Sequence, residues 1–249
     1  MPDDLIKGRK ISIIIPALNE EKLIRKVLEQ FDKSIRNNYN IEVIISDGGS
    51  SDKTIEIAGK YADKVLTHNK AYSQNISRGR NEGARKSQGD VLIFLNADTR
   101  FENLQFLLKE TLREIFENNV SAIACAVYVY PEEEIKSDKV FHFIYNLYTS
   151  ILVCCFTGMG RGECHIIERE IFFKTGGYNE DIIAGEDFEM YMRLKKSGKL
   201  KFRKDFVVYE SPRRYRSYGY LKIMREWMKN ALYVYFLKRS ASAKWEEVR

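Results

Sequence analysis

Short apolar runs that alternate with amphipathic segments constrain the fold of this chain more than any other feature. Ile11–Ile15 is closed by Pro16, and Ile41–Ser46 and Val91–Leu95 repeat this pattern of a strand buried on both faces. The other predicted elements are helices at about Glu20–Phe31, from Asp52 onward and at Ser73–Ser87, and a short strand at Lys64–Thr67. Strands that alternate with helices predict an α/β fold with a parallel sheet and right-handed crossovers.

The second half of the chain is less regular. It predicts a helix at about Glu102–Glu117 and strands at Ala122–Tyr130 and Phe206–Tyr209. Between these strands, Val140–Gly160 contains 21 residues without Asp, Glu, Lys or Arg, which is long enough for a membrane span. Polar residues interrupt the stretch, so we favour a buried helix. An interfacial or acceptor-facing helix and a spanning helix are the alternatives.

Polar side chains follow three of the predicted strands, at Asn19-Glu20, Asp47 and Asn96-Ala97-Asp98. In parallel sheets, ligands bind at the carboxyl ends of the strands. Asn96 and Asp98 are two residues apart, so their side chains face the same way in an extended segment. Two such oxygen-bearing groups can bind a hard divalent cation. A polar turn at the end of a strand is the alternative interpretation.

A carboxylate pair, Glu186-Asp187, follows a glycine-rich segment. Gly176-Gly177-Tyr178 predicts a turn, and Glu186-Asp187 begins an amphipathic helix that carries Arg193. The helix dipole favours carboxylates in the first turn regardless of function. By themselves, these residues are therefore compatible with a helix cap or with a catalytic base.

Taken in chain order, these segments resemble the family 2 glycosyltransferases over about residues 10–215. The motifs that carry the resemblance are Pro16-Ala17-Leu18-Asn19-Glu20, Ser46-Asp47-Gly48-Gly49-Ser50-Ser51-Asp52, Gly79-Arg80-Asn81-Glu82-Gly83-Ala84-Arg85, Asn96-Ala97-Asp98-Thr99 and Gly176-Gly177-Tyr178 with Glu186-Asp187. The resemblance implies a GT-A fold, in which a Rossmann-like, nucleotide-binding parallel or mixed sheet is flanked by helices. We expect this domain over residues 1–212 and a basic amphipathic helical extension over residues 213–249.

The resemblance also implies roles for single residues. Asp187 would be the catalytic base, and Glu186 would support its geometry or contact the acceptor. Asp98 would hold a metal ion, with Asn96 beside it near the ribose or the metal. Asp47 would accept a hydrogen bond from the nucleotide base, and Arg80 would lie on the donor side. The remaining residues expected near the nucleotide are Pro16, Ala17, Asn19, Glu20 and Gly49.

The implied reaction is the inverting transfer of a sugar from a UDP- or GDP-sugar to an acceptor hydroxyl or phosphate. Mg²⁺ or Mn²⁺ would neutralise the diphosphate leaving group, and the base would take the acceptor's proton. This chain has Asn96 where many relatives have Asp. Asn keeps an oxygen ligand but lacks a charge, so we expect Asp98 and the diphosphate to contribute most of the metal binding.

Basic residues gather toward the C-terminus. From Lys201 to Arg249, 13 Lys/Arg minus 5 Asp/Glu give +8, which leaves −2 for residues 1–200 of a chain whose net charge is +6. Arg213 and Arg214 either contact the donor diphosphate or belong to a solvated loop. Residues 220–238 carry aromatic and basic side chains at helical spacing. They either lie on an anionic membrane, near a lipid-linked acceptor, or pack on the domain or on a second subunit of a homodimer.

Other functions stay open on the sequence alone. A sugar-phosphate nucleotidyltransferase shares such a sheet, but the Pro16–Glu20 loop lacks its Gly-rich signature with a following basic residue. A non-catalytic nucleotide-binding or nucleic-acid-binding relative would use the basic end without sequence specificity. The 4 cysteines contain no Cys-x-x-Cys pair, which disfavours a zinc site. No signal peptide is expected at Met1–Asp4, so we expect a cytoplasmic protein, peripheral at the inner membrane face if it contacts lipid.

Overall fold

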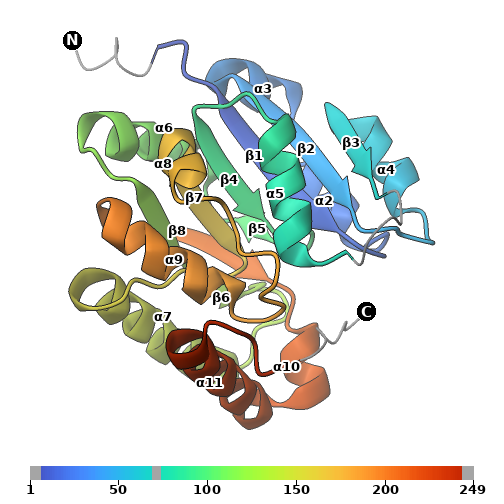
Figure 1. Ribbon diagram of the computed structural model, residues 1–249. Helices are drawn as coiled ribbons and strands as arrows, with labels where there is room; N and C mark the ends of the chain where they lie inside the picture. Colours follow the sequence, from blue (N-terminus) through green and yellow to red (C-terminus); the bar gives the residue numbers. More distant parts are fainter. Residues whose placement is uncertain (1–6, 69–73, 243–249) are drawn as a thin grey trace.

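Figure 1 shows the computed structural model, which describes residues 7–68 and 74–242. An eight-stranded sheet of order β3-β2-β1-β4-β7-β6-β8-β5 forms its centre. The strands are β1 Ile11–Ala17, β2 Ile41–Asp47, β3 Lys64–Thr67, β4 Val91–Leu95, β5 Arg100–Phe101, β6 Ala122–Val129, β7 Cys164–Glu168 and β8 Leu200–Glu210. The helices are α2 Ile24–Leu28, α3 Lys33–Tyr39, α4 Thr54–Tyr61, α5 Ile76–Lys86, α6 Leu104–Leu112, the π-helix η1 Arg113–Glu117, α7 Lys136–Cys155, α8 Arg169–Lys174, α9 Glu186–Ser197, α10 Arg213–Tyr218 and α11 Tyr220–Leu237.

The first half of the sheet is parallel, as the sequence predicts. β3, β2, β1 and β4 run in one direction, and Ile14 pairs with Ile44 on one side and Phe94 on the other. β7 joins β4 in the antiparallel sense, and β6 pairs antiparallel with β7 and parallel with β8. The sheet is therefore mixed, and its parallel half brings the ends of β1, β2 and β4 to one edge.

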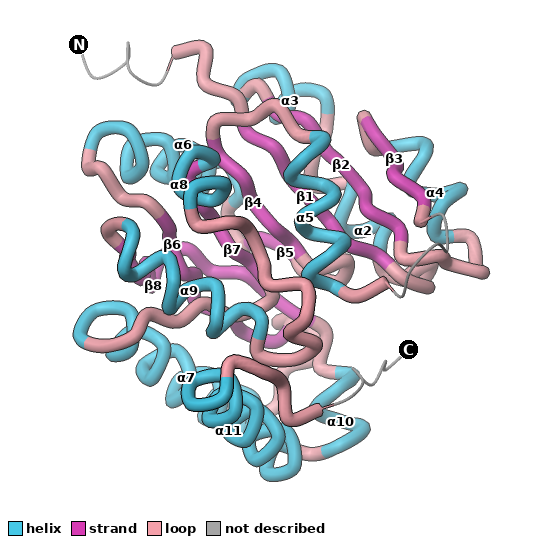
Figure 2. Tube along the Cα trace, viewed as in Figure 1, coloured by secondary structure: helices cyan, strands magenta, loops and turns pink. Residues whose placement is uncertain are grey.

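Two apolar clusters cover the two faces of the sheet. Along β1, Ile13 and Ile15 belong to a cluster that contains side chains of α2, α4 and α6. Ile14, between them, belongs to a second cluster with side chains of α5, α7, α8 and α9. Successive residues of a strand point to opposite faces, so the continuous apolar run of β1 is required by helices on both sides. Helices α7, α10 and α11 gather beyond the β6–β8 end (Figure 2).

Several predicted boundaries are wrong. The first helix is limited to α2, because backbone N–H groups of Glu20 and Glu21 donate to Thr54 Oγ1 (2.7 Å) and Asp52 Oδ2 (3.1 Å) instead of continuing a helix. The last strand is β8, longer than predicted. The sequence also missed α3, β5, β7 and α8. Three expectations fall partly on residues that are not described: Ser73 of the third predicted helix, Met1–Asp4, and residues 243–249 of the expected C-terminal extension.

The charge-free stretch forms most of α7, and the favoured interpretation of a buried helix is wrong. The side chains of Phe143 and Leu147 are 65% and 53% exposed. Among the residues that the structure describes, no helix has both the length and the apolar composition that crossing a membrane requires.

Candidate active site

The loops after β1 and β2 hold each other in place through polar side chains. Asn19 adopts a positive φ of 52°, which lets its Oδ1 accept from the backbone N–H of Ser51 at 2.8 Å while its own N–H donates to Ser50 Oγ at 2.8 Å. Asp47 Oδ2 accepts from the N–H groups of Gly49 (2.8 Å) and Ser50 (2.9 Å). Asp47 Oδ1 is buried without a hydrogen-bond partner in the described structure, so it keeps an acceptor available to a ligand.

Helix α5 lies directly against the end of β1. A Cβ placed on Gly79 would lie 3.3 Å from Pro16 Cβ, and Ala17 pairs with Asp47 across the two strands. This close packing brings Arg80, the next residue of α5, beneath the edge of the sheet at which β1, β2 and β4 end.

An ion pair joins the loop after β1, the loop after β4 and the start of α10. Arg213 donates to both carboxylate oxygens of Glu20, at 2.9 and 2.7 Å, and to Asp98 Oδ2 at 3.1 Å. Burial raises the pKa of Asp98 to about 6, with Glu20 and Glu163 adding to the rise and Arg213 opposing it. The Tyr130 hydroxyl donates to the Asp98 backbone carbonyl. Arg213 thus neutralises carboxylates at the predicted metal position.

Arg80 connects the two halves of the molecule. Its side chain is fully buried, and Nη1 donates to Glu186 Oε1 at 3.0 Å. Nη2 donates to Asn96 Oδ1 at 3.2 Å and to the Gly162 carbonyl at 2.6 Å. One guanidinium therefore fixes the end of β4, the turn before β7 and the start of α9 relative to one another.

The start of α9 presents Asp187 beside this guanidinium. Gly185 precedes the helix with a φ of 85°, a left-handed conformation that favours glycine. Asp187 Oδ1 accepts from the Phe188 N–H at 2.8 Å. A Cβ placed on Gly162 would lie 3.7 Å from both Asp187 Oδ2 and Arg80 Nη2, so the absence of a side chain there leaves room beside the carboxylate.

The pKa of Asp187 is strongly perturbed. Burial raises it to about 7, and the neighbouring Glu186 carboxylate adds to the rise, while the Phe188 N–H and Arg80 oppose it. A carboxyl with a pKa near the working pH accepts a proton efficiently during a reaction. The arrangement therefore suits general-base chemistry better than simple helix capping, which leaves a carboxylate exposed and ionised.

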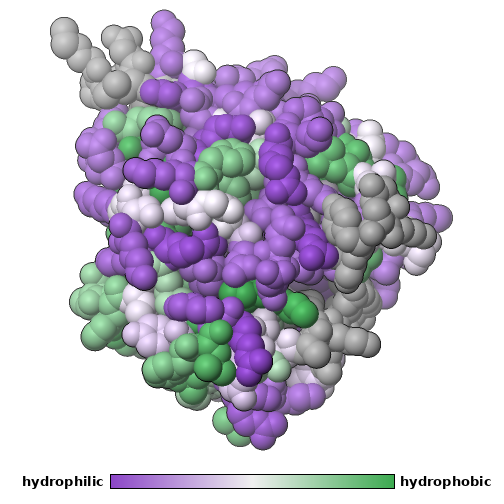
Figure 3. Space-filling view, in the orientation of Figure 1, coloured by the Kyte–Doolittle hydropathy of each residue, from purple (hydrophilic) through white to green (hydrophobic). Residues whose placement is uncertain are grey.

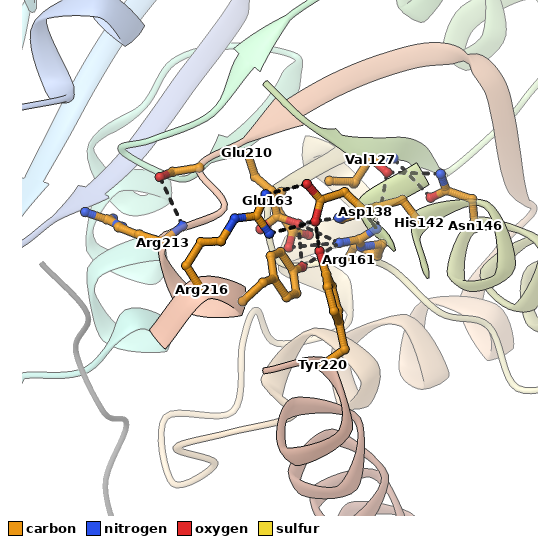
Figure 4. Close-up of polar contacts among 12 residues, drawn as sticks. Val127, Asp138, His142, Asn146, Arg161, Glu163, Glu210, Arg213, Arg216 and Tyr220 are labelled. Atoms are coloured by element: carbon orange, nitrogen blue, oxygen red, sulfur yellow. Dashed lines mark hydrogen bonds and ion pairs between the residues drawn. The ribbon is translucent and has the colours of Figure 1, made fainter. Parts of the chain in front are cut away.

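Figure 4 shows a buried polar cluster that the sequence did not predict. Arg161 is 2% exposed and donates to Glu210 Oε1 (2.8 Å) and Glu163 Oε1 (3.4 Å). Its Nη1 lies 3.1 Å from His142 Nδ1, and burial with this guanidinium lowers the pKa of His142 to about 3. Burial and Glu163 raise the pKa of Glu210 well above its usual value.

The sequence does carry a signal for part of this cluster. Gly160-Arg161-Gly162-Glu163 places charged residues between glycines, immediately after the charge-free stretch. Within the described part of the chain, Glu163 Oε2 is buried without a hydrogen-bond partner, and the Glu163 carboxylate raises the pKa values of both Asp98 and Asp187. Glu163 therefore lies between the residues around Asp98 and the residues around Asp187.

The oxygen donors near Asp98 fit a divalent cation only in part. Asp98 supplies a carboxylate, the ligand type that Mg²⁺ and Mn²⁺ prefer. Asn96 Oδ1 already accepts from Arg80. Within residues 7–68 and 74–242, no group of three or more His, Cys, Asp or Glu side chains is placed to hold a metal. A bound cation would therefore need further ligands from a substrate or from water.

A comparison with known proteins identifies the family to which this chain belongs. A family model described as glycosyl transferase family 2 matches residues 12–175, which include β1, β2, β4 and the Gly160–Glu163 turn. The chain belongs to glycosyl transferase family 2. The predicted enzyme class is thus confirmed, and the nucleotidyltransferase alternative is wrong.

Individual relatives agree with this membership. The chain is 28% identical over 254 residues to a dolichyl N-acetyl-α-D-glucosaminyl phosphate 3-β-D-2,3-diacetamido-2,3-dideoxy-β-D-glucuronosyltransferase of Methanococcus voltae, covering 89% of this chain and 70% of that protein. It spans less of other curated relatives, 43% of one and 41% of another.

Solved structures show the same fold. A Pyrobaculum calidifontis mannosyltransferase, solved with GDP-Man and Mn²⁺, superposes with a TM-score of 0.70 at 19% identity, covering 95% of this chain and 69% of that one. Glucosyl-3-phosphoglycerate synthase of Mycobacterium tuberculosis, solved with Mn²⁺, UDP and glucosyl-3-phosphoglycerate, gives 0.62 at 15% identity, covering 95% and 82%. The predicted GT-A fold is confirmed.

The predicted site residues lie along one edge of the sheet in connected groups. Arg213 joins Glu20 to Asp98, and Arg80 joins Asn96 to Glu186. The ends of β1 and β2 carry Pro16, Ala17, Asn19, Asp47 and Gly49. Arg214 is half-buried in α10, and burial lowers its pKa. The roles of these residues, and the domain boundary at residue 212, stay predictions.

Proposed function

We propose that this glycosyltransferase moves a sugar from a nucleoside-diphosphate sugar to an acceptor with inversion, and that Asp187 is the general base. The observation that carries the proposal is the position of Asp187: its pKa is raised to about 7, and the side-chain-free Gly162 leaves room beside its Oδ2. A single carboxylate there can remove the acceptor's proton as the acceptor attacks the sugar.

The donor side of the proposal rests on the opposite loops. Asp47 Oδ1 has no hydrogen-bond partner among the described residues and is suited to accept from an N–H group of a uracil or guanine base. The solved relatives were crystallised with GDP-Man or with UDP, which supports a UDP- or GDP-sugar as donor. Arg213 or Arg214 would contact the diphosphate, because a guanidinium can bind phosphate oxygens bidentately.

A divalent cation fits this proposal through Asp98. When bound, Mg²⁺ or Mn²⁺ would stabilise the negative charge that develops on the leaving diphosphate. Asp98 would supply the protein's carboxylate ligand, and Asn96 would stay bonded to Arg80. Arg213 has to give up part of its contact with Asp98 for this ligand to become available.

The acceptor is proposed only as a class. The Methanococcus relative acts, by its name, on a dolichyl-linked sugar phosphate, which supports a lipid-linked sugar as the acceptor. A hydroxyl of such a sugar would approach Asp187 Oδ2 where Gly162 leaves room beside it.

An Asp187→Asn variant tests the base. The variant keeps the shape of the side chain and removes its basicity, so we expect nucleoside diphosphate release from the accepted donor to fall by about 10²–10⁴-fold. Donor binding, measured as the thermal shift with UDP- and GDP-sugars in the presence of Mn²⁺, should change little. Full turnover by this variant would refute the assignment.

Asp181→Asn is the matched control. Asp181 is exposed in the loop before α9, and the substitution makes the same change of charge without touching Arg80 or Glu186. Its rate should equal that of the wild type. An equal loss in both variants would indicate a general effect of charge instead of the loss of a base.

A further inference from the structure

Helix α7 is oriented with its polar side inward. The buried residues on one side of the helix are Asp138, His142, Asn146, Thr149 and Val153. Most of them are polar, and they are held by specific partners: Asn146, for instance, exchanges two hydrogen bonds of 3.0 Å with the backbone of Val127. A surface helix of a soluble protein normally buries its apolar stripe and exposes its polar one. Here the arrangement is reversed.

The outer side of α7 is correspondingly apolar. Its exposed large hydrophobic residues, with the residue that follows the helix, are Val140, Phe143, Ile144, Leu147, Tyr148, Ile151 and Phe156. Exposed apolar residues continue on α11, where they are Leu221, Met224, Met228, Leu232, Tyr233, Tyr235, Phe236 and Leu237. Figure 3 shows hydrophobic side chains gathered over these helices, at the lower left of the view.

The two exposed sides belong to one surface, because the helices contact each other. The ring centroids of Phe141 and Tyr220 are 4.5 Å apart, and those of Tyr145 and Trp227 are 5.2 Å apart. We define the α7–α11 face as the exposed apolar residues of these two helices. Contiguous apolar surface of this extent is unusual on a monomeric soluble protein and indicates an interaction site.

The charges beside the α7–α11 face indicate what kind of partner binds to it. Lys222, Arg225 and Lys229 are exposed and lie three to four residues apart beside the apolar stripe of α11, so they share one flank of the helix. Glu226 is the one acidic residue in the sequence of α11. Two copies of this face meeting each other would bring these basic flanks together, whereas anionic lipid headgroups would complement them.

We propose that the α7–α11 face docks the protein on an anionic lipid membrane, with both helices in the interfacial plane. Apolar side chains would enter the boundary between headgroups and acyl chains, and the basic flank of α11 would contact lipid phosphates. The docking does not depend on the proposed sugar transfer. Nonetheless, α11 packs against the start of α9, which carries Asp187: a Cβ on Gly185 would lie 3.2 Å from the buried Val234 of α11.

Vesicle co-sedimentation of the full chain tests the proposal. We expect binding to vesicles of phosphatidylcholine with 30% phosphatidylglycerol (about that fraction suffices for an anionic surface) and much weaker binding to pure phosphatidylcholine. The triple variant Lys222→Gln, Arg225→Gln, Lys229→Gln should lower the partition coefficient by about 100-fold, because each basic residue contributes about a factor of five. An unchanged coefficient would overturn the electrostatic part of the argument.

A second triple variant controls for net charge. Lys33, Lys174 and Lys204 are exposed outside the α7–α11 face, and changing all three to Gln alters the charge of the protein equally. This variant should bind vesicles like the wild type. Equal losses in both triple variants would show that binding follows overall charge instead of this face.

The double variant Phe143→Ser with Leu147→Ser tests how much the apolar side chains of the face contribute to membrane binding. Both side chains are exposed, so the melting temperature should not fall, while vesicle binding should weaken by on the order of 10–100-fold. Light scattering without vesicles tests the alternative, in which a second copy of the chain covers the face. A wild-type dimer that this double variant dissociates, together with no vesicle binding, would assign the face to a second copy and overturn the proposal.

The native thiols offer a measurement without mutation. Cys154 and Cys155 are exposed on α7, and Cys125 and Cys164 are buried. An environment-sensitive fluorophore on the exposed thiols should shift to the blue when anionic vesicles are added. No shift on vesicles that sediment the protein would show that another surface binds the lipid.

Discussion

Replacing Arg80 by Met is expected to lower the free energy of unfolding by about 3 kcal/mol. Met keeps much of the apolar stem, so the cavity left behind is small. The variant loses the bonds to Asn96 and the Gly162 carbonyl and leaves Glu186, which is 7% exposed, without its cation. Removing one partner of a buried ion pair costs about 3–5 kcal/mol, and we take the lower end because the Met side chain keeps the cavity small.

Urea denaturation followed by far-UV circular dichroism measures this change. Arg85→Met, on the same helix, is the matched control: the Arg85 side chain is 55% exposed and lies 3.5 Å from Glu180. An exposed pair contributes less than about 1 kcal/mol. In Arg80→Met with Glu186→Gln, at least about 1 kcal/mol should be recovered, because the unpaired charge is gone. A loss in Arg80→Met no larger than in Arg85→Met would refute the reasoning.

Three further outcomes follow from the contacts described above. Gly160→Ala should destabilise the fold by about 3 kcal/mol in the same urea assay, because its Cβ would lie 2.1 Å from Tyr191 Cε2. Gly59→Ala should stabilise the fold by about 1 kcal/mol, because a Cβ at this position of α4 would meet no described atom from outside its own helix backbone within 4 Å. The pKa of Asp98 is raised to about 6, so its ionised fraction, and with it Mn²⁺ affinity in calorimetry, should fall about 10-fold from pH 7 to pH 5; equal affinities would contradict this role. Arg213→Met should bind Mn²⁺ alone about 10-fold more tightly than the wild type, because Nη2 no longer occupies Asp98 Oδ2; weaker binding would show that Arg213 does not compete with the metal.

The parallel half of the fold is predictable because each strand there is buried on both faces. β1, β2 and β4 are continuous apolar runs, and polar motifs mark their carboxyl ends. β7, whose sequence is Cys-His-Ile-Ile-Glu, lacks such a run. Its conformation depends on antiparallel pairing with β4 and β6, which are distant in sequence. The local sequence pattern cannot predict a strand whose formation depends on tertiary pairing.

The prediction that the charge-free stretch forms a buried helix was wrong for a different reason. A period of 3.6 residues shows that two sides of a helix differ, and the core normally takes the apolar one. Here the inner side carries His142 and Asn146 because Arg161 and the backbone of β6 supply polar partners. Those partners lie 19 residues away in the chain, so the inward side could not be chosen from the local sequence.

The arrangement of the candidate site was predictable in part. Glu20, Asp98 and Asp187 belong to the motifs through which the sequence resembles the family 2 glycosyltransferases. The structure brings the loops that carry them to one side of the sheet. That Arg213 connects Glu20 with Asp98 was not predictable, because Arg213 and Glu20 are 193 residues apart. Long-range ion pairs depend on the assembled fold instead of on local sequence.

The thickness of α7 has a consequence for any acceptor that is anchored in lipid. An α-helix with its side chains is about 10–12 Å across, and Tyr145, toward the inner side of α7, is close enough to Asp187 for the two to interact electrostatically. With the apolar side chains of the α7–α11 face at the boundary between headgroups and acyl chains, the proposed base would lie roughly one helix diameter above that boundary. A hydroxyl at the level of the acyl chains would fall short of it. In this arrangement, the helix would set a minimum length for the part of the acceptor that projects from the acyl chains.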